Sequence, residues 1–252
     1  MNAAWIDPSA RIGAGTEMGH GVIIERDVVI GEGCRIGHHV VLREGSILGN
    51  NVRIDDHAVT GKWPMRAANS ILKPEQRLDP TEIGDGCMIG TAAVIYRGAR
   101  LGPSILVADQ ATVRERVVIG AFTIVGRGVV VENDCTVGRY CKLETECYIT
   151  AYSTLEDRVF VAPQVTTSND NFVGRTKERF EHFRGVTVRR GGRIGAGSVI
   201  LPGLTIGEDA LIAAGAVLTR DAPPRMILLG APARPWREVP KEQLLENQGW
   251  PE

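Results

Sequence analysis

The sequence lacks the features that would place the protein in a membrane, on nucleic acid or outside the cell. No apolar run approaches the roughly 18 residues of a membrane span. The first residues show no basic segment followed by an apolar one, so we expect no secretory signal. The formal net charge is −1, which argues against nucleic acid as the main partner. We therefore expect a cytoplasmic protein that binds neither a membrane nor nucleic acid.

The cysteines include no CxxC pair, which disfavours both disulfides and a zinc site. Each of them falls at the same small position of a repeating six-residue unit. A buried free thiol behaves as a small apolar side chain, so we expect these residues to fill the core. They are Cys34, Cys87, Cys135, Cys141 and Cys147.

A six-residue repeat is the strongest pattern in the chain. Over Ile83–Val161 a branched apolar residue returns at every sixth position, and four residues after each one stands a small or β-branched residue. The same period runs over Ile6–Ile54 and Val188–Leu218. A period of six predicts a parallel β-helix, and hence an all-β fold.

The spacing within each hexad explains why such a chain would coil. Side chains two positions apart in a strand share a face, so each hexad points two residues inward and turns a corner over the next three. Corners need residues that tolerate unusual backbone angles, and they are rich in Gly, Asn and Asp, as in Gly84–Gly86. Three hexads close a triangular coil of 18 residues, so we expect about ten coils.

Two breaks interrupt the repeat. Residues 60–82 and 166–187 carry no period, and long loops in a compact repeat domain are usually functional. We expect one β-helix domain over residues 1–223, with these two segments extruded from its corners. The C-terminal extension, residues 224–252, is rich in proline and should contain a short helix that starts near Pro240 and caps the last coil.

The hexads over nearly the whole chain resemble those of the left-handed β-helix acyltransferases. The SNDN loop at 168–171 and the GAPAR sequence at 230–234 make the chain similar to bacterial nucleotide-sugar N-acetyltransferases. This resemblance implies left-handed winding, a homotrimer, and acetyl-CoA bound between neighbouring helices. It also implies acetyl transfer to the amino group of a dTDP- or UDP-linked amino sugar, with a 3-amino sugar as the expected substrate.

The second loop supplies candidates for catalysis. His182 is a candidate proton acceptor near neutral pH, and Asn169 is expected to act beside it. Glu144 follows an inward residue, so it should point outward and could orient the amine. An amine attacks a thioester readily, so the reaction can proceed without a dedicated base. Asp170 and Asn171 are expected to bind the sugar; the alternative is an ordinary polar loop.

The first loop supplies candidates for nucleotide binding. Trp63 can stack on a base, and Lys62 and Arg66 suit a pyrophosphate. The alternative is a loop that is merely pinned by a buried tryptophan.

The resemblance places the nucleotide end of acetyl-CoA near the C-terminal coils. The phosphates of CoA need cations, and we expect Arg220 and Arg234 to supply them. Backbone groups around Gly197, Ala214 and Gly215 are expected to bind the pantetheine arm. The alternative for each arginine is a solvated surface position.

Three other functions stay open. A sugar O-acetyltransferase would share the donor, a zinc-dependent protein like the γ-class carbonic anhydrases would need histidine ligands, and a scaffold would have no activity. His20 and His38 are 18 residues apart, as are His39 and His57, so each pair could form a column. These are corner positions where histidine is tolerated, and the H-x4-H pair of the carbonic anhydrases is absent, so we expect no metal.

Overall fold

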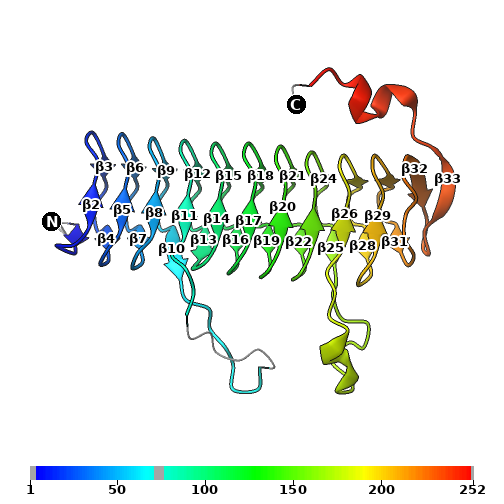
Figure 1. The fold of residues 1–252 in the computed structure, drawn as a ribbon, viewed down its shortest axis with the longest axis horizontal. Helices are drawn as coiled ribbons and strands as arrows, with labels where there is room; N and C mark the ends of the chain where they lie inside the picture. Colours follow the sequence, from blue (N-terminus) through cyan, green and yellow to red (C-terminus); the bar gives the residue numbers. More distant parts are fainter. Residues whose placement is uncertain (1–3, 71–76, 251–252) are drawn as a thin grey trace. The chain divides into compact units, whose positions relative to one another are not determined.

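A computed structural model describes residues 4–70 and 77–250, and it confirms an all-β parallel β-helix (Figure 1). The chain divides into two compact units, Met1–Gly128 and Val129–Glu252. In each unit the strands form three faces, named here first, second and third in chain order. Each corner takes the number of the face that precedes it, and the residue two positions after the inward strand residue is called the middle corner residue.

The first unit pairs its strands in parallel, coil upon coil. Trp5 and Ile6 pair with Ile23 and Ile24, which sets the register of 18 residues expected for a three-sided coil. Its first face holds β1 (Trp5–Ile6), β4 (Ile23–Ile24), β7 (Val41–Leu42), β10 (Val59–Lys62), β13 (Val94–Tyr96) and β16 (Thr112–Val113). Its second face holds β2 (Arg11–Ile12), β5 (Val29–Ile30), β8 (Ile47–Leu48), β11 (Glu82–Ile83), β14 (Arg100–Leu101) and β17 (Val118–Ile119). Its third face holds β3 (Glu17–Met18), β6 (Arg35–Ile36), β9 (Arg53–Ile54), β12 (Met88–Ile89), β15 (Leu106–Val107) and β18 (Ile124–Val125).

The second unit repeats this arrangement. Its first face holds β19 (Val130–Val131), β22 (Tyr148–Ile149), β25 (Thr166–Thr167), β28 (Val199–Ile200) and β31 (Val217–Leu218). Its second face holds β20 (Thr136–Val137), β23 (Thr154–Leu155), β26 (Thr187–Val188) and β29 (Thr205–Ile206). Its third face holds β21 (Lys142–Leu143), β24 (Phe160–Val161), β27 (Arg193–Ile194), β30 (Leu211–Ile212), β32 (Met226–Leu229) and β33 (Arg234–Glu238). In the described residues the three faces hold 11, 10 and 12 strands, so the expected ten coils are slightly too few.

The core of both units is the column of inward side chains that the repeat predicts. Leu42, Ile95 and Leu143 are fully buried, and their equivalents on other coils are buried too, except on the first coil, where Ile6 and Ile12 are exposed. All five cysteines are free and buried, as expected of core residues. Burial raises the pKa of Cys135 and of Cys147 to about 12, so these thiols stay protonated and unreactive near neutral pH.

Side chains at the corners cap the backbone of the preceding coil. The N–H of a middle corner residue donates to the side chain of the middle corner residue one coil further on, as the Thr91 N–H does to Asp109 Oδ1 at 2.9 Å. This is why Asp, Asn and His recur there: each offers an acceptor and tolerates a turn. The other pairs are His20 with His38, Glu32 with Asn50, His38 with Asp56, Asn50 with Asp85, and Arg139 with Asp157.

Both loops leave the first corner after a strand whose inward residue is threonine. Strand β10 includes Thr60 and β25 includes Thr167, and both threonines are buried, so the coil continues into the two segments expected to be loops. The six-residue period cannot be recognised at these two strands, because a polar threonine stands at the inward position where other hexads have an apolar residue. Thr167 Oγ1 accepts the Thr150 N–H at 2.8 Å, a role that a backbone carbonyl fills in regular coils. The first loop includes residues 71–76, which lie outside the described residues.

The C-terminal extension closes the last coil. Strand β33 pairs antiparallel with β32 and covers its free edge, which would otherwise be open to another chain. Two 3-10 turns, η2 (Lys241–Gln243) and η3 (Leu245–Asn247), follow Pro240 in place of one continuous helix. Ile227, Val239 and Leu244 form a small apolar cluster beneath them. Within residues 4–70 and 77–250, no helix has the length and apolar character needed to cross a membrane.

Replacing Thr167 by Val tests the hydroxyl at the exit of the second loop. The change keeps the shape but leaves the buried Thr150 N–H without its acceptor, so the free energy of unfolding should fall by about 1–3 kcal/mol. Urea denaturation measures this. The neighbouring Thr166 is exposed, and Thr166→Val should change the stability by less than about 0.5 kcal/mol. Equal stability of the two variants would contradict the assignment.

Candidate functional site

The second loop folds over a hollow of its own, with a volume of about 270 Å³. His182 lies at its rim with its side chain half exposed, and its ring is tilted against Phe172 with centroids 5.8 Å apart. Its Nε2 is 3.7 Å from Glu178 Oε1, at the start of the 3-10 turn η1 (Glu178–Glu181). The hollow can therefore receive a polar group beside an imidazole. Its lining is Asn171, Phe172, Glu178, His182, Arg184, Pro202 and Gly203.

The carboxylate of Asp170 shapes this loop from within. It accepts the N–H groups of Phe172 and Gly174 at 2.9 and 3.0 Å, and Arg179 lies 2.8 Å away. Desolvation works against the charge, but the two N–H donors and Arg179 lower the pKa of Asp170 below its ordinary value. Its expected role in sugar binding stays a prediction, and its oxygens already have partners inside the loop.

The three residues expected to act in catalysis do not meet within the second unit. The carbonyl oxygen of Asn169 accepts the Arg184 N–H at 3.2 Å, which closes the neck of the loop that carries His182. Glu144 is half buried and stands at the third corner, after β21, whereas the loop leaves the first corner, after β25. Counting hexads in threes from Leu143 to Thr167 would have shown this, because the two positions are four hexads apart.

The residues expected to bind pantetheine lie at the third corner of the second unit, on coils where no side chain caps the middle corner N–H. The middle corner residue there is Ala196, followed one coil on by Ala214 and then Gly230, and none of these side chains can accept a hydrogen bond. We call Ala196 and Ala214 the open steps. A Cβ at Gly197 or Gly215 would meet nothing within 4 Å, so the surface beside them is free. This arrangement leaves the N–H groups of two successive coils without the side-chain acceptor found at several other corners.

Apolar and cationic groups flank the open steps. Val199 and Val217 face outward in register on the adjoining first face, and both are partly exposed. Arg234 is exposed and pairs with Leu229 at the end of β32, next to Gly230. Arg220 is also exposed, but it follows β31 at the first corner. The structure therefore groups Gly197, Ala214, Gly215 and Arg234, and it sets Arg220 at a different corner.

The residues expected in the first loop lie among further charged groups in the first unit. The Arg97 guanidinium is 5.0 Å from the ring of Trp63, and the Lys62 ammonium is 5.5 Å from the ring of Tyr96. Arg66 is buried and forms an ion pair of 2.5 Å with Glu115. Sequence reasoning missed Tyr96, Arg97, Arg114 and Glu115. The sequence gives no distinct signal for them, because charged residues also stand at other first corners, such as Arg26 and Glu44.

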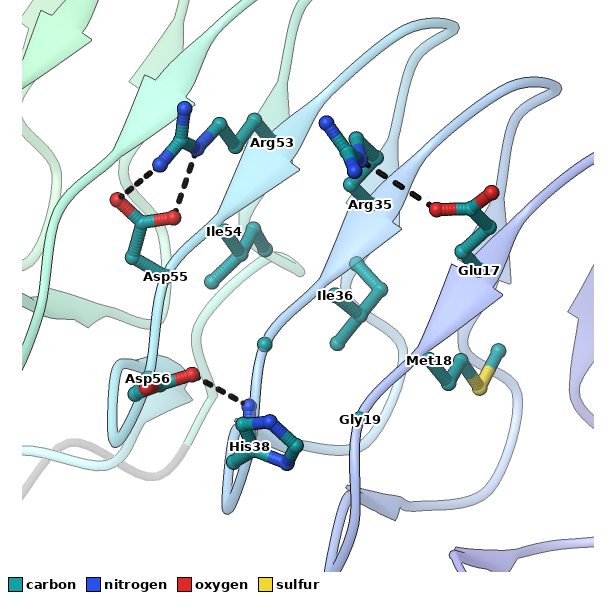
Figure 2. A pocket seen from close by; sticks show the side chains of 11 residues that line it. Glu17, Met18, Gly19, Arg35, Ile36, His38, Arg53, Ile54, Asp55 and Asp56 are labelled. Carbon is teal, nitrogen blue, oxygen red and sulfur yellow. Dashed lines mark hydrogen bonds and ion pairs between the residues drawn. The ribbon is translucent and has the colours of Figure 1, made fainter.

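A groove of about 440 Å³ crosses the third face of the first unit (Figure 2). Its charged groups are engaged with one another: Arg53 binds Asp55 at 2.7 and 3.2 Å, and Arg35 lies 3.4 Å from Glu17. The His38 N–H donates to Asp56 Oδ1. Because these charged side chains already pair with one another, the groove does not present groups suited to the expected acetyl transfer.

The histidine pairs form the two columns that their spacing indicates. The rings of His20 and His38 stack with centroids 5.3 Å apart, and those of His39 and His57 at 5.1 Å. In the described part of the chain, no three His, Cys, Asp or Glu residues are grouped so that they could hold a metal ion.

Comparison with known families and structures adds the following. The family described as "Bacterial transferase hexapeptide (six repeats)" matches residues 27–62, and "Hexapeptide repeat of succinyl-transferase" matches 80–108 and 185–220. The chain thus carries transferase hexapeptide repeats in both units. Its fold is similar to that of the Arabidopsis UDP-N-acetylglucosamine acyltransferase, with a TM-score of 0.62 and 20% identity over 98% of this chain and 76% of that one.

Two relatives are similar over shorter stretches. The chain is 48% identical over 54 residues to the dTDP-3-amino-3,6-dideoxy-alpha-D-galactopyranose 3-N-acetyltransferase of Aneurinibacillus thermoaerophilus, covering 21% of this chain and 28% of that one. It is 41% identical over 54 residues to the galactoside O-acetyltransferase of Escherichia coli, covering 21% and 27%. The matched stretches span about a quarter of each relative's length.

Replacing Asp170 by Asn tests the internal brace of the second loop. The amide can still accept one N–H but cannot neutralise Arg179, so the loop should open more often. Trypsin should then cut after Arg175 or Lys177 at least about threefold faster, as followed by mass spectrometry. Glu181→Gln, at an exposed position of η1, is the matched control and should leave the rate unchanged. Equal cutting of both variants would show that Asp170 does not hold the loop.

Proposed function

We propose that the protein transfers the acetyl group of acetyl-CoA to the amino group of a dTDP- or UDP-linked amino sugar, with a 3-amino sugar as the expected substrate. The observation that carries this proposal is the pair of open steps, Ala196 and Ala214, where the side-chain caps of the coil are missing. The similarity to a dTDP-amino-sugar N-acetyltransferase supports the choice of acceptor. The hexapeptide repeats support an acyl transfer.

The backbone N–H groups at the open steps suit the pantetheine arm of acetyl-CoA. The two amide carbonyls of pantetheine need N–H donors spaced along an extended chain, and the N–H groups of Ala196 and Ala214 recur at the spacing of one coil, about 4.8 Å. Gly197 and Gly215 have no side chain to block the approach. Val199 and Val217 offer apolar contact to the methylene groups, and Arg234 can bind a phosphate at the end of the stack.

The attack of an amine on a thioester requires few catalytic groups from the protein. The amine nitrogen forms a bond to the thioester carbon, the carbon–sulfur bond breaks, and the thiolate of CoA leaves. The amine loses a proton, which His182 or water takes, and the thiolate gains one. Glu144 shares the third corner with the open steps, so we assign it to the thioester end, where its carboxylate can orient the incoming ammonium or amine.

A homotrimer would bring the two kinds of corner together. Within one chain, Glu144 and the open steps lie at third corners, and His182, Asn169 and Asn171 belong to a first-corner loop. We infer that the loop of one subunit meets the third corner of its neighbour. An apolar stripe supports association: on the first face of the first unit, every outward residue from β1 to β13 is apolar. These residues are Trp5, Ile23, Val41, Val59 and Val94.

The second candidate is transfer to a sugar hydroxyl, as the similarity to a galactoside O-acetyltransferase suggests. A hydroxyl needs a base more than an amine does, and His182 beside Glu178 is the available one. The two reactions are separated by their products, because an ester is cleaved by mild hydroxylamine and an amide is not. Two observations favour the amine as the acceptor. His182 is half exposed, and the chain is similar to an N-acetyltransferase that acts on a dTDP-linked amino sugar.

Replacing Ala214 by Asp tests the donor site directly. The new carboxylate would cap the Ala196 N–H in the way that Asp109 and Asp157 cap their neighbours. The fold should tolerate it, while the Kd and KM for acetyl-CoA should rise about tenfold or more, because a donor is lost and a negative charge faces the ligand. Calorimetric titration and a CoA-release assay measure the two constants.

The matched control for this change is Ala121→Asp in the first unit. Ala121 is also a middle corner residue, and the residue one coil earlier is Pro103, which has no N–H to cap. This variant should bind acetyl-CoA as the wild type does. If Ala214→Asp bound acetyl-CoA with unchanged affinity, the open steps would not be the donor site.

Replacing His182 by Ala tests the proton acceptor, using CoA release across a panel of dTDP- and UDP-amino sugars. Loss of a true general base should cost about 100-fold in kcat/KM. A loss smaller than about threefold would show that the amine delivers its proton to water instead. His57→Ala removes a stacked corner histidine in the first unit and should leave the kinetics unchanged.

A further inference from the structure

A fully buried carboxylate stands at the foot of the first loop. Glu115 is the middle corner residue after β16 and is 0% exposed. Its Oε1 accepts from Arg66 at 2.5 Å, and its Oε2 accepts from Arg114 Nε at 2.9 Å. A second Arg114 nitrogen lies 3.2 Å from Oε1. One carboxylate therefore holds an arginine of the loop and an arginine of the coil at the same time.

The ion pair between Arg66 and Glu115 connects the first loop to a different coil from the one at which the loop begins. The loop leaves after β10, and Glu115 follows β16, which lies two coils further along the same face. The coil between them carries Tyr96 at the end of β13 and Arg97 directly after it. The outgoing limb of the loop therefore crosses that intermediate coil to reach Glu115.

The groups on the intermediate coil hold both limbs of the loop. Arg97 lies over the ring of Trp63 on the outgoing limb, and its Nε donates to the Leu78 carbonyl on the returning limb at 3.1 Å. The ring of Tyr96 lies between two cations, because Lys62 comes from the coil before it and Arg114 from the coil after it. The position of Lys62 and Trp63 thus depends on contacts that Glu115 completes.

Glu115 supplies the negative charge on which the cluster with Arg66 and Arg114 depends. Burial raises the pKa of Glu115, but the hydrogen bonds from Arg114 and Arg66 outweigh it and hold the pKa below its ordinary value, so the group is charged near neutral pH. Arg66 is itself buried, with a side chain only 9% exposed. A buried guanidinium without a counter-charge is costly, so loss of the carboxylate should expel Arg66 and the loop with it.

We propose that Glu115 is the positioning residue of the first loop, and that it fixes Lys62 and Trp63 in the arrangement that receives the nucleotide of the acceptor substrate. Arg66 then serves as the anchor of the loop, and Lys62 is left to meet the diphosphate. This proposal rests on the proposed function for its substrate, and on the geometry alone for the anchoring.

Replacing Glu115 by Gln separates the two parts of the proposal. Trypsin should cut within the first loop about tenfold faster or more, because the population of the open loop controls the rate. The KM for the nucleotide sugar should rise about tenfold while kcat changes less than threefold, and the Kd for acetyl-CoA should stay unchanged. A residue that merely stabilises the coil would not move KM alone. Glu115→Asp keeps the charge and should restore part of both effects.

Two further variants complete the test. Asp55→Asn removes an exposed partner of Arg53 in the same unit and should change neither readout. Arg66→Met frees the loop while Glu115 stays paired with Arg114, so it should reproduce the faster cutting even if Glu115→Gln does not fold.

The outcomes distinguish the proposal from the proposed function. Unchanged cutting in both Glu115→Gln and Arg66→Met would overturn the anchoring. Faster cutting with an unchanged KM would overturn the positioning role. If the wild type acetylated no nucleotide sugar, the proposed function would fail, and equilibrium binding of dTDP or UDP to the wild type and Glu115→Gln would then decide the positioning role: a weaker affinity in the variant supports it, and equal affinities overturn it.

Discussion

The fold depends on one constraint: the backbone N–H groups of a coil must find acceptors, and most of them do so on a neighbouring coil. The strands meet this need through parallel pairing in an 18-residue register. The corners meet it through side chains, as when Asp109 accepts from the Thr91 N–H. Ala196 and Ala214 are exposed, so their N–H groups can bind water or a ligand where no side chain caps them. The open steps at Ala196 and Ala214 lack side-chain caps on two successive coils, beside glycines whose approach is unobstructed.

The regular part of the fold could be predicted from the sequence because the hexad is a local pattern. Its period gives the strands, the inward residues and the buried cysteines without knowledge of tertiary contacts. The pattern failed at Thr60 and Thr167, where a hydroxyl replaces an apolar group because the chain leaves the coil. The single C-terminal helix became two 3-10 turns, since packing over Ile227 and Val239 decides its path.

The candidate site could be predicted only in part. The period located the two loops and the glycine-rich corners, so residues such as His182 and Gly197 could be named in advance. The pairing of Arg66 with Glu115 could not, because the two residues are 49 positions apart and meet only through the path of the loop. The path of the first loop makes Arg66 an anchor, and the turn within the second loop makes Asp170 a brace. Both had been expected to face a ligand, and both are engaged within the protein.

The most direct test of the account is hydrogen–deuterium exchange, resolved to single residues, with and without acetyl-CoA. The amides of Ala196 and Ala214 should exchange quickly in the free protein, because they lack the caps found elsewhere, and slowly once acetyl-CoA is bound. The capped amides of Thr91 and Arg139 should be slow in both states. Slow exchange of the two alanine amides in the free protein, or no added protection with acetyl-CoA, would contradict the central claim.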